Sequence, residues 1–400
     1  MFADRSLCER RLAVLCLFIY IVAVTLGAFT GGLWATLGIG LATVLFFGVW
    51  FIDKKMPQPP KELTQFACVA LACFAMELPL SSQVALSGKV WVQLASIFLT
   101  LILLTSQRLQ TATLSRSFVP VVALAAGIGA VALGFELLSG GTLIHLLKKP
   151  GASLTEYNRG IAHLVILAFP LFAGLWISGK RSVAVVLALV LLFPACLTES
   201  RTAKLALIVG VACAAAAFYR PLWARRGLAA GAVAIMGWPF YAQYIFSTAY
   251  PTVENLPPSW RHRVEIWDYL SYRIAERPFF GWGLGTTHML DFSQPHGNLY
   301  KFAVQGAPHA HNFVTELWVE TGLVGLALGF VFLLLTLRSA FALHASLRPF
   351  ALGGWAAAVA VSMFGFDFWT DALWAAFALS AFAFGMLQQQ LERGENLVDA

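Results

Sequence analysis

The stretch Pro308-His309-Ala310-His311-Asn312, with the apolar run from Phe313 to about Leu337 that follows it, decides how the rest of the chain is interpreted. The run is long enough to cross the roughly 30 Å hydrocarbon core of a bilayer. A membrane helix usually begins with an aromatic residue or with Lys or Arg at headgroup level. This one begins with two imidazoles and an amide. Ionisable groups at that depth cost free energy and mark functional sites, so the sequence predicts a site at the start of this helix.

The composition predicts an all-α polytopic membrane protein. Hydrophobic residues make up 59% of the 400 residues and charged residues only 12%. In a soluble protein the net charge of +7 would suggest nucleic acid, but here we attribute it to topology and expect no nucleic-acid partner. The six cysteines indicate no disulfide framework. The apolar runs predict twelve membrane helices, at roughly 12–30, 32–52, 62–80, 91–106, 118–138, 159–178, 182–197, 202–219, 227–247, 313–337, 349–366 and 372–390.

Basic residues predict the orientation of these helices. With the N-terminus inside, the inner loops hold 16 of the 27 Lys and Arg residues, as the positive-inside rule requires. Both termini are therefore predicted to be cytoplasmic. The first helix is expected to stay uncleaved, because no small-residue cleavage site follows it. The other 11 basic residues are expected outside: Lys89, Lys148, Lys149, Arg159, Arg201, Lys204, Arg261, Arg263, Arg273, Arg277 and Lys301.

A long polar segment, 248–312, separates nine predicted membrane helices in 1–247 from three more in 313–400, which end in a cytoplasmic tail. We predict that it forms a periplasmic helical subdomain. A helix is expected over about 260–276, with Ser259 as its N-cap and Pro278 beyond its end. The Gly-aromatic run 279–285 is too apolar for a solvated loop, so it is expected in the membrane interface or against helix ends. No strand precedes it, so a nucleotide site is not indicated.

Positive charge kept on the outer face opposes the orientation bias, which suggests that it serves an anionic ligand. The guanidinium group of Arg matches phosphate oxygens in a bidentate fashion. Arg159 and Arg261 are therefore candidates for substrate binding, as are Lys148 and Lys149 beside the 139–158 loop. Snorkelling to lipid phosphates is an equal alternative for the two lysines.

Four motifs resemble those of the bacterial O-antigen ligases and their relatives in the O-antigen polymerase superfamily. The first is His311-Asn312, nine residues, Gly322, two residues and Gly325. The resemblance covers about 155–330. The other motifs match the family residue by residue: Arg201 in Thr198-Glu199-Ser200-Arg201-Thr202, Arg263 in Arg263-Val264-Glu265-Ile266-Trp267, and the run Pro278-Phe279-Phe280-Gly281-Trp282-Gly283.

The resemblance implies a GT-C-like, metal-independent, inverting glycosyltransferase without a cofactor. Such ligases move O-antigen from undecaprenyl diphosphate to the outer sugar of lipid A–core oligosaccharide, at the periplasmic face of the bacterial inner membrane. Arg201 and Arg263 would hold the departing diphosphate, where negative charge grows. His311 would act as general base towards the acceptor hydroxyl. His309 and Asn312 are expected to contact substrate.

Several alternatives stay open. An O-antigen polymerase shares this chemistry, and a lipid-linked oligosaccharide flippase is a non-enzymatic alternative, although the charges gather at one face rather than at mid-helix. His309 and His311 could join His288, His296 and Asp291 in a metal cluster, but the spacings suit no particular metal. Structural roles compete as well: an ion pair with Glu199 for Arg201, a helix salt bridge for Arg263 and capping for His311. Polar packing or a salt bridge to an Arg is favoured over direct catalysis for Glu316 and Glu320. Asp367 and Asp371, which bracket the last outer turn, could orient a base or an Arg, and a plain interfacial role is an equal alternative.

Overall fold

The computed structural model describes residues 58–106, 115–147, 154, 157–253, 257–290, 300, 304, 309–365 and 367–392, with 22, 40, 44, 47 and 48. Secondary structure in these residues is helical, without strands. The elements are α3 (Lys61–Glu77), η1 (Leu78–Leu80), α4 (Val84–Thr105), α5 (Ser115–Leu138), α6 (Thr142–Leu147), α7 (Tyr157–Ile177), α8 (Arg181–Leu197), α9 (Arg201–Tyr219), α10 (Pro221–Ile235), α11 (Trp238–Val253), α12 (Pro258–Glu276), η3 (Thr287–Met289), α13 (Phe313–Ala342), α14 (Arg348–Phe364) and α15 (Asp371–Glu392).

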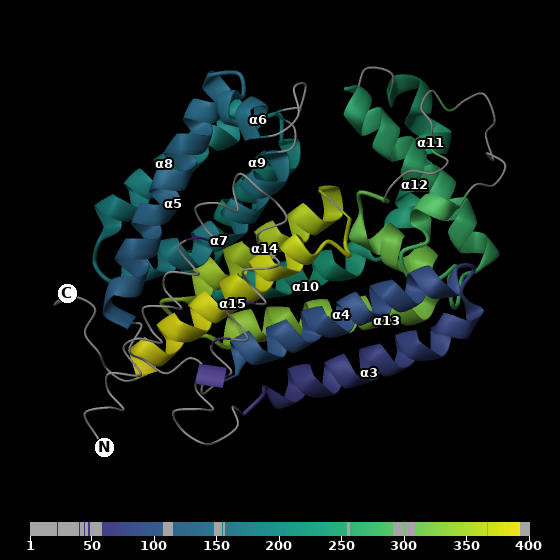
Figure 1. The fold of residues 1–400 in the computed structure, drawn as a ribbon, viewed down its shortest axis with the longest axis horizontal. Coiled ribbons are helices and arrows are strands. Elements are labelled where there is room, and N and C mark those ends of the chain that lie inside the picture. Colours follow the sequence, from purple (N-terminus) through teal and green to yellow (C-terminus); the bar gives the residue numbers. More distant parts are fainter. Residues whose placement is uncertain are drawn as a thin grey trace.

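Helices α7 and α14 form the middle of the bundle (Figure 1). Helix α7 packs against α8, α14 and α15, and it is apolar around most of its circumference, as a helix enclosed by others must be. Helix α9 lies along α14, while α3 pairs with α4 and α5 pairs with α8. Helices α11 and α12 stand together beside the start of α13.

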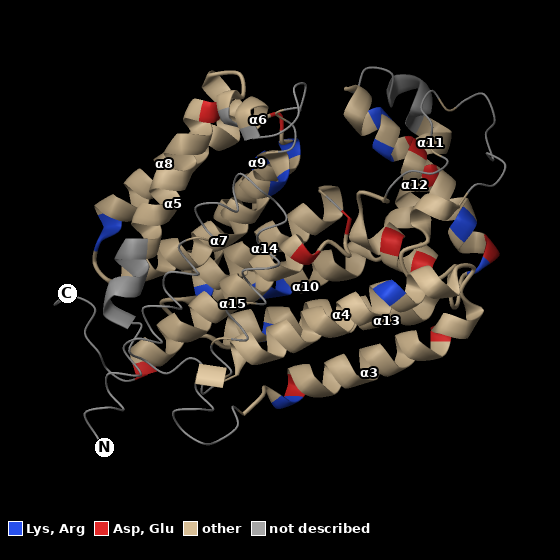
Figure 2. Cartoon of the chain, viewed as in Figure 1, with Lys and Arg blue, Asp and Glu red and all other residues tan. Residues whose placement is uncertain are grey.

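Six described helical segments are long and apolar enough to cross a membrane. Figure 2 shows long uncharged stretches along α8, α13 and α15. The all-helical prediction is confirmed, and the architecture is that expected of a multi-pass membrane protein. The predicted helices at 12–30 and 32–52 lie outside the described residues, so the count of twelve stays a prediction. The six segments are Lys61–Leu80, Val84–Thr105, Tyr157–Ile177, Arg201–Tyr219, Phe313–Ala342 and Asp371–Glu392.

Two local predictions were wrong. The helix expected at 227–247 is two helices, because α10 ends at Ile235 and α11 begins at Trp238. Pro239 has no backbone N–H to continue the hydrogen-bond ladder of α10. With 15 residues, α10 rises only about 22 Å. Ser259 is not the N-cap of α12: the helix begins one residue earlier, at Pro258, with Pro257 in the cap position.

A loop packs into a kink of α13. Gly322 interrupts the helix with φ 64° and ψ −159°. Two N–H groups of the loop, of Trp282 and Gly283, donate to the carbonyls of the turn before the kink at 2.9 and 2.7 Å. A Cβ on Gly322 would lie 2.2 Å from the carbonyl carbon of Phe279, and one on Gly281 would meet α13 equally closely. These glycines allow two backbones to touch, so the Gly-aromatic run packs into a kink inside α13, whereas the sequence predicted packing against helix ends or in the membrane interface.

The C-terminal end of α13 gathers the basic residues that we assigned to the inner face. Arg338 forms an ion pair with Glu62 of α3 at 3.2 Å. The guanidinium groups of Arg225 and Arg348 lie 4.7 and 4.6 Å from the ring centroid of Phe341. Thus α3, α10, α13 and α14 bring inner-loop charges to one end of the bundle, and the His311 end of α13 lies one helix length away.

This arrangement predicts that the starts of α10 and α12 lie on opposite sides of the membrane. We expect a membrane-impermeant maleimide applied outside intact spheroplasts to label Ser259→Cys but not Arg226→Cys, in a background lacking the six native cysteines. Both positions are exposed. Lysed spheroplasts provide the control, since both variants should then react. Labelling of Arg226→Cys in sealed spheroplasts would contradict the orientation.

Candidate functional site

The site is built around the start of α13. Asn312 caps the helix: its Oδ1 accepts from the backbone N–H of Thr315 at 2.9 Å, and its Nδ2 donates to the carbonyl of Met363 at 3.3 Å. The Asn312 side chain is fully buried. His311 precedes the cap with φ 53°, a left-handed backbone that few residues other than Gly adopt.

The hydrogen bonds of His311 identify the tautomer of its ring. Nδ1 lies 2.9 Å from the carbonyl oxygen of Gly365. A carbonyl oxygen only accepts, so Nδ1 carries the proton. Nε2 of the neutral ring then bears a lone pair, which is what a general base requires. His309 Nε2 lies 3.0 Å from the same Nδ1 and must accept a share of that proton.

A tryptophan of α12 holds the two histidines in place. The indole N–H of Trp267 donates to the carbonyl of Ala310, which lies between them, at 2.8 Å. Arg263 precedes Trp267 by four residues, so the two side chains share one face of α12. The family-like spacing of an Arg four residues before an aromatic therefore has a structural reason. One residue orients the histidine segment and the other brings positive charge to it.

Charged groups from two helices, α7 and α12, act on the histidines. Burial, followed by the neighbouring charges, lowers the pKa of His311 to about 4. Arg263, His262 and Arg159 all contribute to that lowering, although the Gly365 bond opposes it. Burial lowers the pKa of His309 to about 3. His262 was not among the residues predicted from the sequence.

Arg201 completes this group at the exposed start of α9. Burial, and then the charge of Arg201, lowers the pKa of Arg263, which places the two guanidinium groups within electrostatic reach. Arg159 is held near Arg201 by a 2.5 Å hydrogen bond from Thr198 Oγ1 to Asn158 Oδ1, the residue before Arg159. The three arginines come from α7, α9 and α12, and we refer to Arg159, Arg201 and Arg263 as the arginine group.

The carboxylates of α13 cross-link the site to the turn between α14 and α15. Glu320 accepts four hydrogen bonds at 2.6 to 3.1 Å, from Gly285 N, both Thr287 donors and Trp369 Nε1. Glu316 accepts from Phe368 N at 3.2 Å and is hydrogen-bonded to Asp367. Burial raises the pKa of the Asp367 carboxyl, and a bond between two carboxyl groups requires a proton on one of them. Of the two roles favoured for Glu316 and Glu320, polar packing is the one that these hydrogen bonds show.

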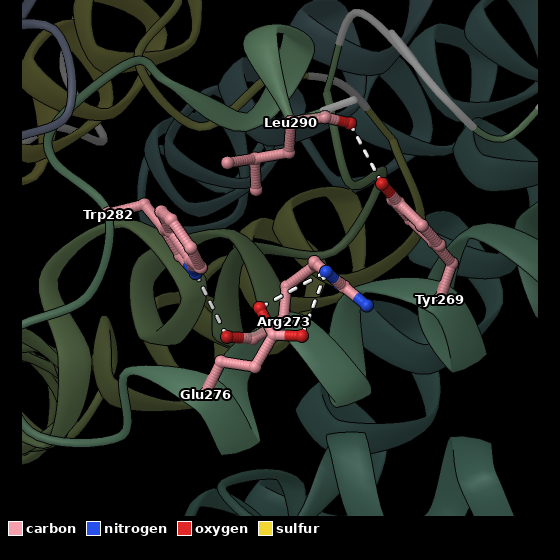
Figure 3. A network of polar contacts seen from close by, with 5 residues as sticks. All are labelled: Tyr269, Arg273, Glu276, Trp282 and Leu290. Atoms are coloured by element: carbon pink, nitrogen blue, oxygen red, sulfur yellow. Dashed lines mark hydrogen bonds and ion pairs between the residues drawn. The ribbon is translucent and has the colours of Figure 1, made fainter. Parts of the chain in front are cut away.

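The loop after α12 is tied back to its helix (Figure 3). Arg273 forms an ion pair with Glu276 at 2.8 Å, and its carbonyl accepts from Trp282 Nε1 at 2.9 Å. The hydroxyl of Tyr269 donates to the carbonyl of Leu290 at 2.9 Å. Arg273, predicted on the outer side of the membrane, is buried within the protein. Its ion pair lies within α12, whereas its carbonyl binds Trp282 of the loop that packs into α13.

Some of the predicted site residues lie outside the part of the chain that the structure describes. Lys148 and Lys149 lie outside the described residues, as do Asp291 and His296 of the metal alternative. Arg261 is half-buried near the start of α12. Within the described part of the chain, no group of three His, Cys, Asp or Glu residues is placed to hold a metal ion.

Comparison with known proteins agrees with the motifs. Residues 183–330 match the family model described as O-antigen ligase. The resemblance inferred from the sequence is thereby confirmed. The matched region contains Arg201, Arg263 and His311 but not Arg159 or Asp367, which the fold brings to the same place.

Two curated relatives give the same indication. A Rickettsia conorii protein, named provisionally as a polysaccharide ligase, is 26% identical over 206 residues. A Rickettsia bellii protein with the same provisional name is 28% identical over 204 residues. Each match covers 48% of this chain and 48% of the relative, so the chain spans about half the length of the curated relatives it matches.

The lowered pKa of His311 predicts an unusual pH profile. A lowered pKa keeps the imidazole neutral as pH falls from 7 towards about 4. We therefore expect kcat/KM for transfer, which reports the free enzyme, to show no acid limb near the ordinary value of about 6.5. A bound diphosphate would offset the arginine charges and raise the pKa of His311, so the acid limb of kcat should lie at higher pH than that of kcat/KM.

The folded fraction must be followed at each pH in this experiment. A histidine with a folded-state pKa below about 6.5 destabilises the fold as pH drops below that value, because the unfolded chain then binds more protons. An acid limb of kcat/KM near 6.5 in protein that is still folded would contradict the assignment of His311 as a neutral base in this environment.

Proposed function

We propose that the protein is an O-antigen ligase that transfers glycan from undecaprenyl diphosphate to the outer sugar of lipid A–core oligosaccharide, at the periplasmic face of the bacterial inner membrane. The observation that carries the proposal is the pairing of an imidazole Nε2, left open by the Nδ1–Gly365 bond, with the arginine group beside it. The family match supports a polysaccharide-ligase type of activity.

The chemistry follows from the two parts of the site. The acceptor hydroxyl gives its proton to His311 Nε2 as its oxygen attacks the anomeric carbon of the donor glycan. The diphosphate leaves from the opposite side of that carbon as its bond to the diphosphate oxygen breaks, so the anomeric configuration is inverted. Negative charge grows on the departing diphosphate, and the arginine group stabilises it most in the transition state. No step requires a metal or a nucleotide.

The depth of the site suits two lipid-anchored substrates. Arg338 lies near the inner end of α13. Trp318 lies twenty residues closer to the N-terminus of the same helix, which corresponds to a rise of about 30 Å. That is about the thickness of a bilayer core. Aromatic residues at this level form a belt: Phe240 packs on Trp318 with ring centroids 5.5 Å apart, and Phe279 and Phe280 are exposed. His311 lies just beyond this level, where the headgroup diphosphate of a polyprenyl donor would sit.

An O-antigen polymerase would use the same base and the same cations, so the acceptor has to be tested directly. Purified protein in nanodiscs, given lipid-linked glycan, should transfer it to added lipid A–core. Products in which the glycan is extended on its own lipid would identify a polymerase, and the absence of both products in well-folded protein would count against the proposed function.

The base assignment predicts different outcomes for the two histidines. A positioned base contributes about 10²–10⁴-fold, so His311→Ala should lower kcat by that amount with little loss of folded protein. His309→Ala should retain a measurable part of the activity, because Gly365 still holds Nδ1 of His311. Initial rates of transfer in nanodiscs measure both variants. The reverse order of the two activities would show that His309 is the base.

The arginine group predicts that charge alone is not sufficient. Lys keeps the charge but lacks the planar fork that binds two phosphate oxygens. Arg201→Lys and Arg263→Lys should each lower kcat by roughly tenfold or more while the protein still accumulates in the membrane. Arg226→Lys, at the other end of the bundle, is the matched control and should be unchanged. Full activity in both site variants would remove the bidentate role.

A further inference from the structure

Three consecutive carbonyls end α14, and each accepts a hydrogen bond from a different part of the site. The last carbonyls of a helix have no partner within it, so side chains can bind them. The bonds run from Asn312 Nδ2 to Met363 O (3.3 Å), from Thr202 Oγ1 to Phe364 O (2.5 Å) and from His311 Nδ1 to Gly365 O (2.9 Å).

Of these donors, Thr202 has no role in the function proposed above. We propose that Thr202 is a positioning residue that fixes Arg201 relative to His311. The inference rests on the proposed function, since it concerns how the same site is held. Thr202 is buried and follows the exposed Arg201 directly. Neighbouring helical residues point about 100° apart, so one side chain meets α14 while the other faces outward.

The Thr202 hydroxyl is suited to this bond by its place in the helix. In mid-helix, a threonine hydroxyl bonds the carbonyl four residues earlier, in its own helix. Thr202 is the second residue of α9, so that partner lies before the helix begins. Its hydroxyl instead bonds Phe364, across to α14. The carbonyl of the next residue, Gly365, binds His311. Consecutive Cα atoms are only about 3.8 Å apart, so the Thr202 and His311 side chains are held by neighbouring peptide groups.

Helix α9 contacts α14 closely at a second point, and together the two contacts fix the direction of α9 at its start. Gly210 and Gly353 cross so closely that a Cβ on Gly353 would lie 2.6 Å from the carbonyl oxygen of Gly210. This crossing fixes α9 to α14 eight residues, or about 12 Å, further along. One fixed point allows a helix to pivot, whereas two prevent it. Without the Thr202 bond, the Arg201 end of α9 loses its hydrogen bond to the end of α14 and is held there only by the glycine crossing and the apolar packing between the two helices.

The ring of Phe364 extends the same frame to α12. It packs against Trp260 and Trp267, with ring centroids 5.8 and 6.4 Å apart. The residue whose carbonyl holds Thr202 therefore also contacts the helix that carries Arg263. A displacement of about 1 Å in a catalytic group can cost on the order of 10²-fold in rate, so this frame has to be stiff.

The test compares Thr202→Val, which keeps the shape but removes the hydroxyl, with Thr202→Ser, which keeps the hydroxyl. We expect kcat for glycan transfer to fall by about tenfold or more in the valine variant, with KM for the donor changed by less than about threefold, because Arg201 acts on charge that develops in the transition state. The serine variant should stay within about threefold of the wild type. Thr336→Val is the matched control: it removes the 3.0 Å bond from Trp355 Nε1 that joins α13 and α14 away from the site.

Hydrogen exchange of the amides in 198–206 gives a readout that does not depend on transfer. Thr202→Val should accelerate exchange there, and neither Thr202→Ser nor Thr336→Val should. Wild-type kcat in Thr202→Val, an equal loss in Thr336→Val, or failure of serine to restore the rate would each overturn the positioning role. If the wild type transfers no glycan, the proposed function fails, and unchanged exchange in Thr202→Val would overturn the positioning bond separately.

Discussion

The hydrogen bond from His311 Nδ1 to the carbonyl of Gly365 is the constraint on which the rest of the site depends. It joins the start of α13 to the end of α14 and decides which ring nitrogen is free to act as a base. A carboxylate in the place of Gly365 would bring a charge that raises the pKa of the imidazole. A backbone carbonyl orients the ring without that charge, so burial and the charges of Arg263, His262 and Arg159 keep the pKa of His311 low.

The buried carboxylates of α13 illustrate a second constraint. A charged group near the membrane is stable only where donors surround it. Glu320 receives four, from the loop after α12 and from Trp369 beyond α14. These bonds join segments more than 30 residues apart in sequence. The loop then packs its backbone into the kink at Gly322, so the glycines of the predicted signature hold the loop against the helix that begins beside His311.

Much of this could be predicted from the sequence. Apolar runs predicted nearly all of the described helices, because a helix that crosses the lipid needs a long stretch of apolar residues. His311, Arg201 and Arg263 were predicted to share one site, and in the structure Arg263 lies within electrostatic reach of both His311 and Arg201. The break at Gly237 was missed because α10 and α11 are both apolar, so hydropathy runs through it without a change.

The contribution of Gly365 and Thr202 could not be found from the sequence for a different reason. The Gly365 carbonyl meets His311, and the Thr202 hydroxyl meets the carbonyl of Phe364, only when α9, α13 and α14 converge. Any residue provides a carbonyl, so no sequence pattern marks these bonds. Sequence patterns report side chains, whereas this frame is made largely of backbone at helix ends.

That observation explains why the site lies where it does. The middle of a membrane helix has no spare backbone groups, since each N–H and C=O is bonded within the helix. Free carbonyls occur only in the last turn, and in α14 that turn lies near Arg159 and Arg201 at the starts of α7 and α9 and near Arg263 in the second turn of α12. A histidine oriented by backbone and an arginine group placed near helix starts can therefore coincide only at the ends of the membrane helices. A lipid-linked diphosphate and a lipid-anchored acceptor both keep their headgroups at that boundary.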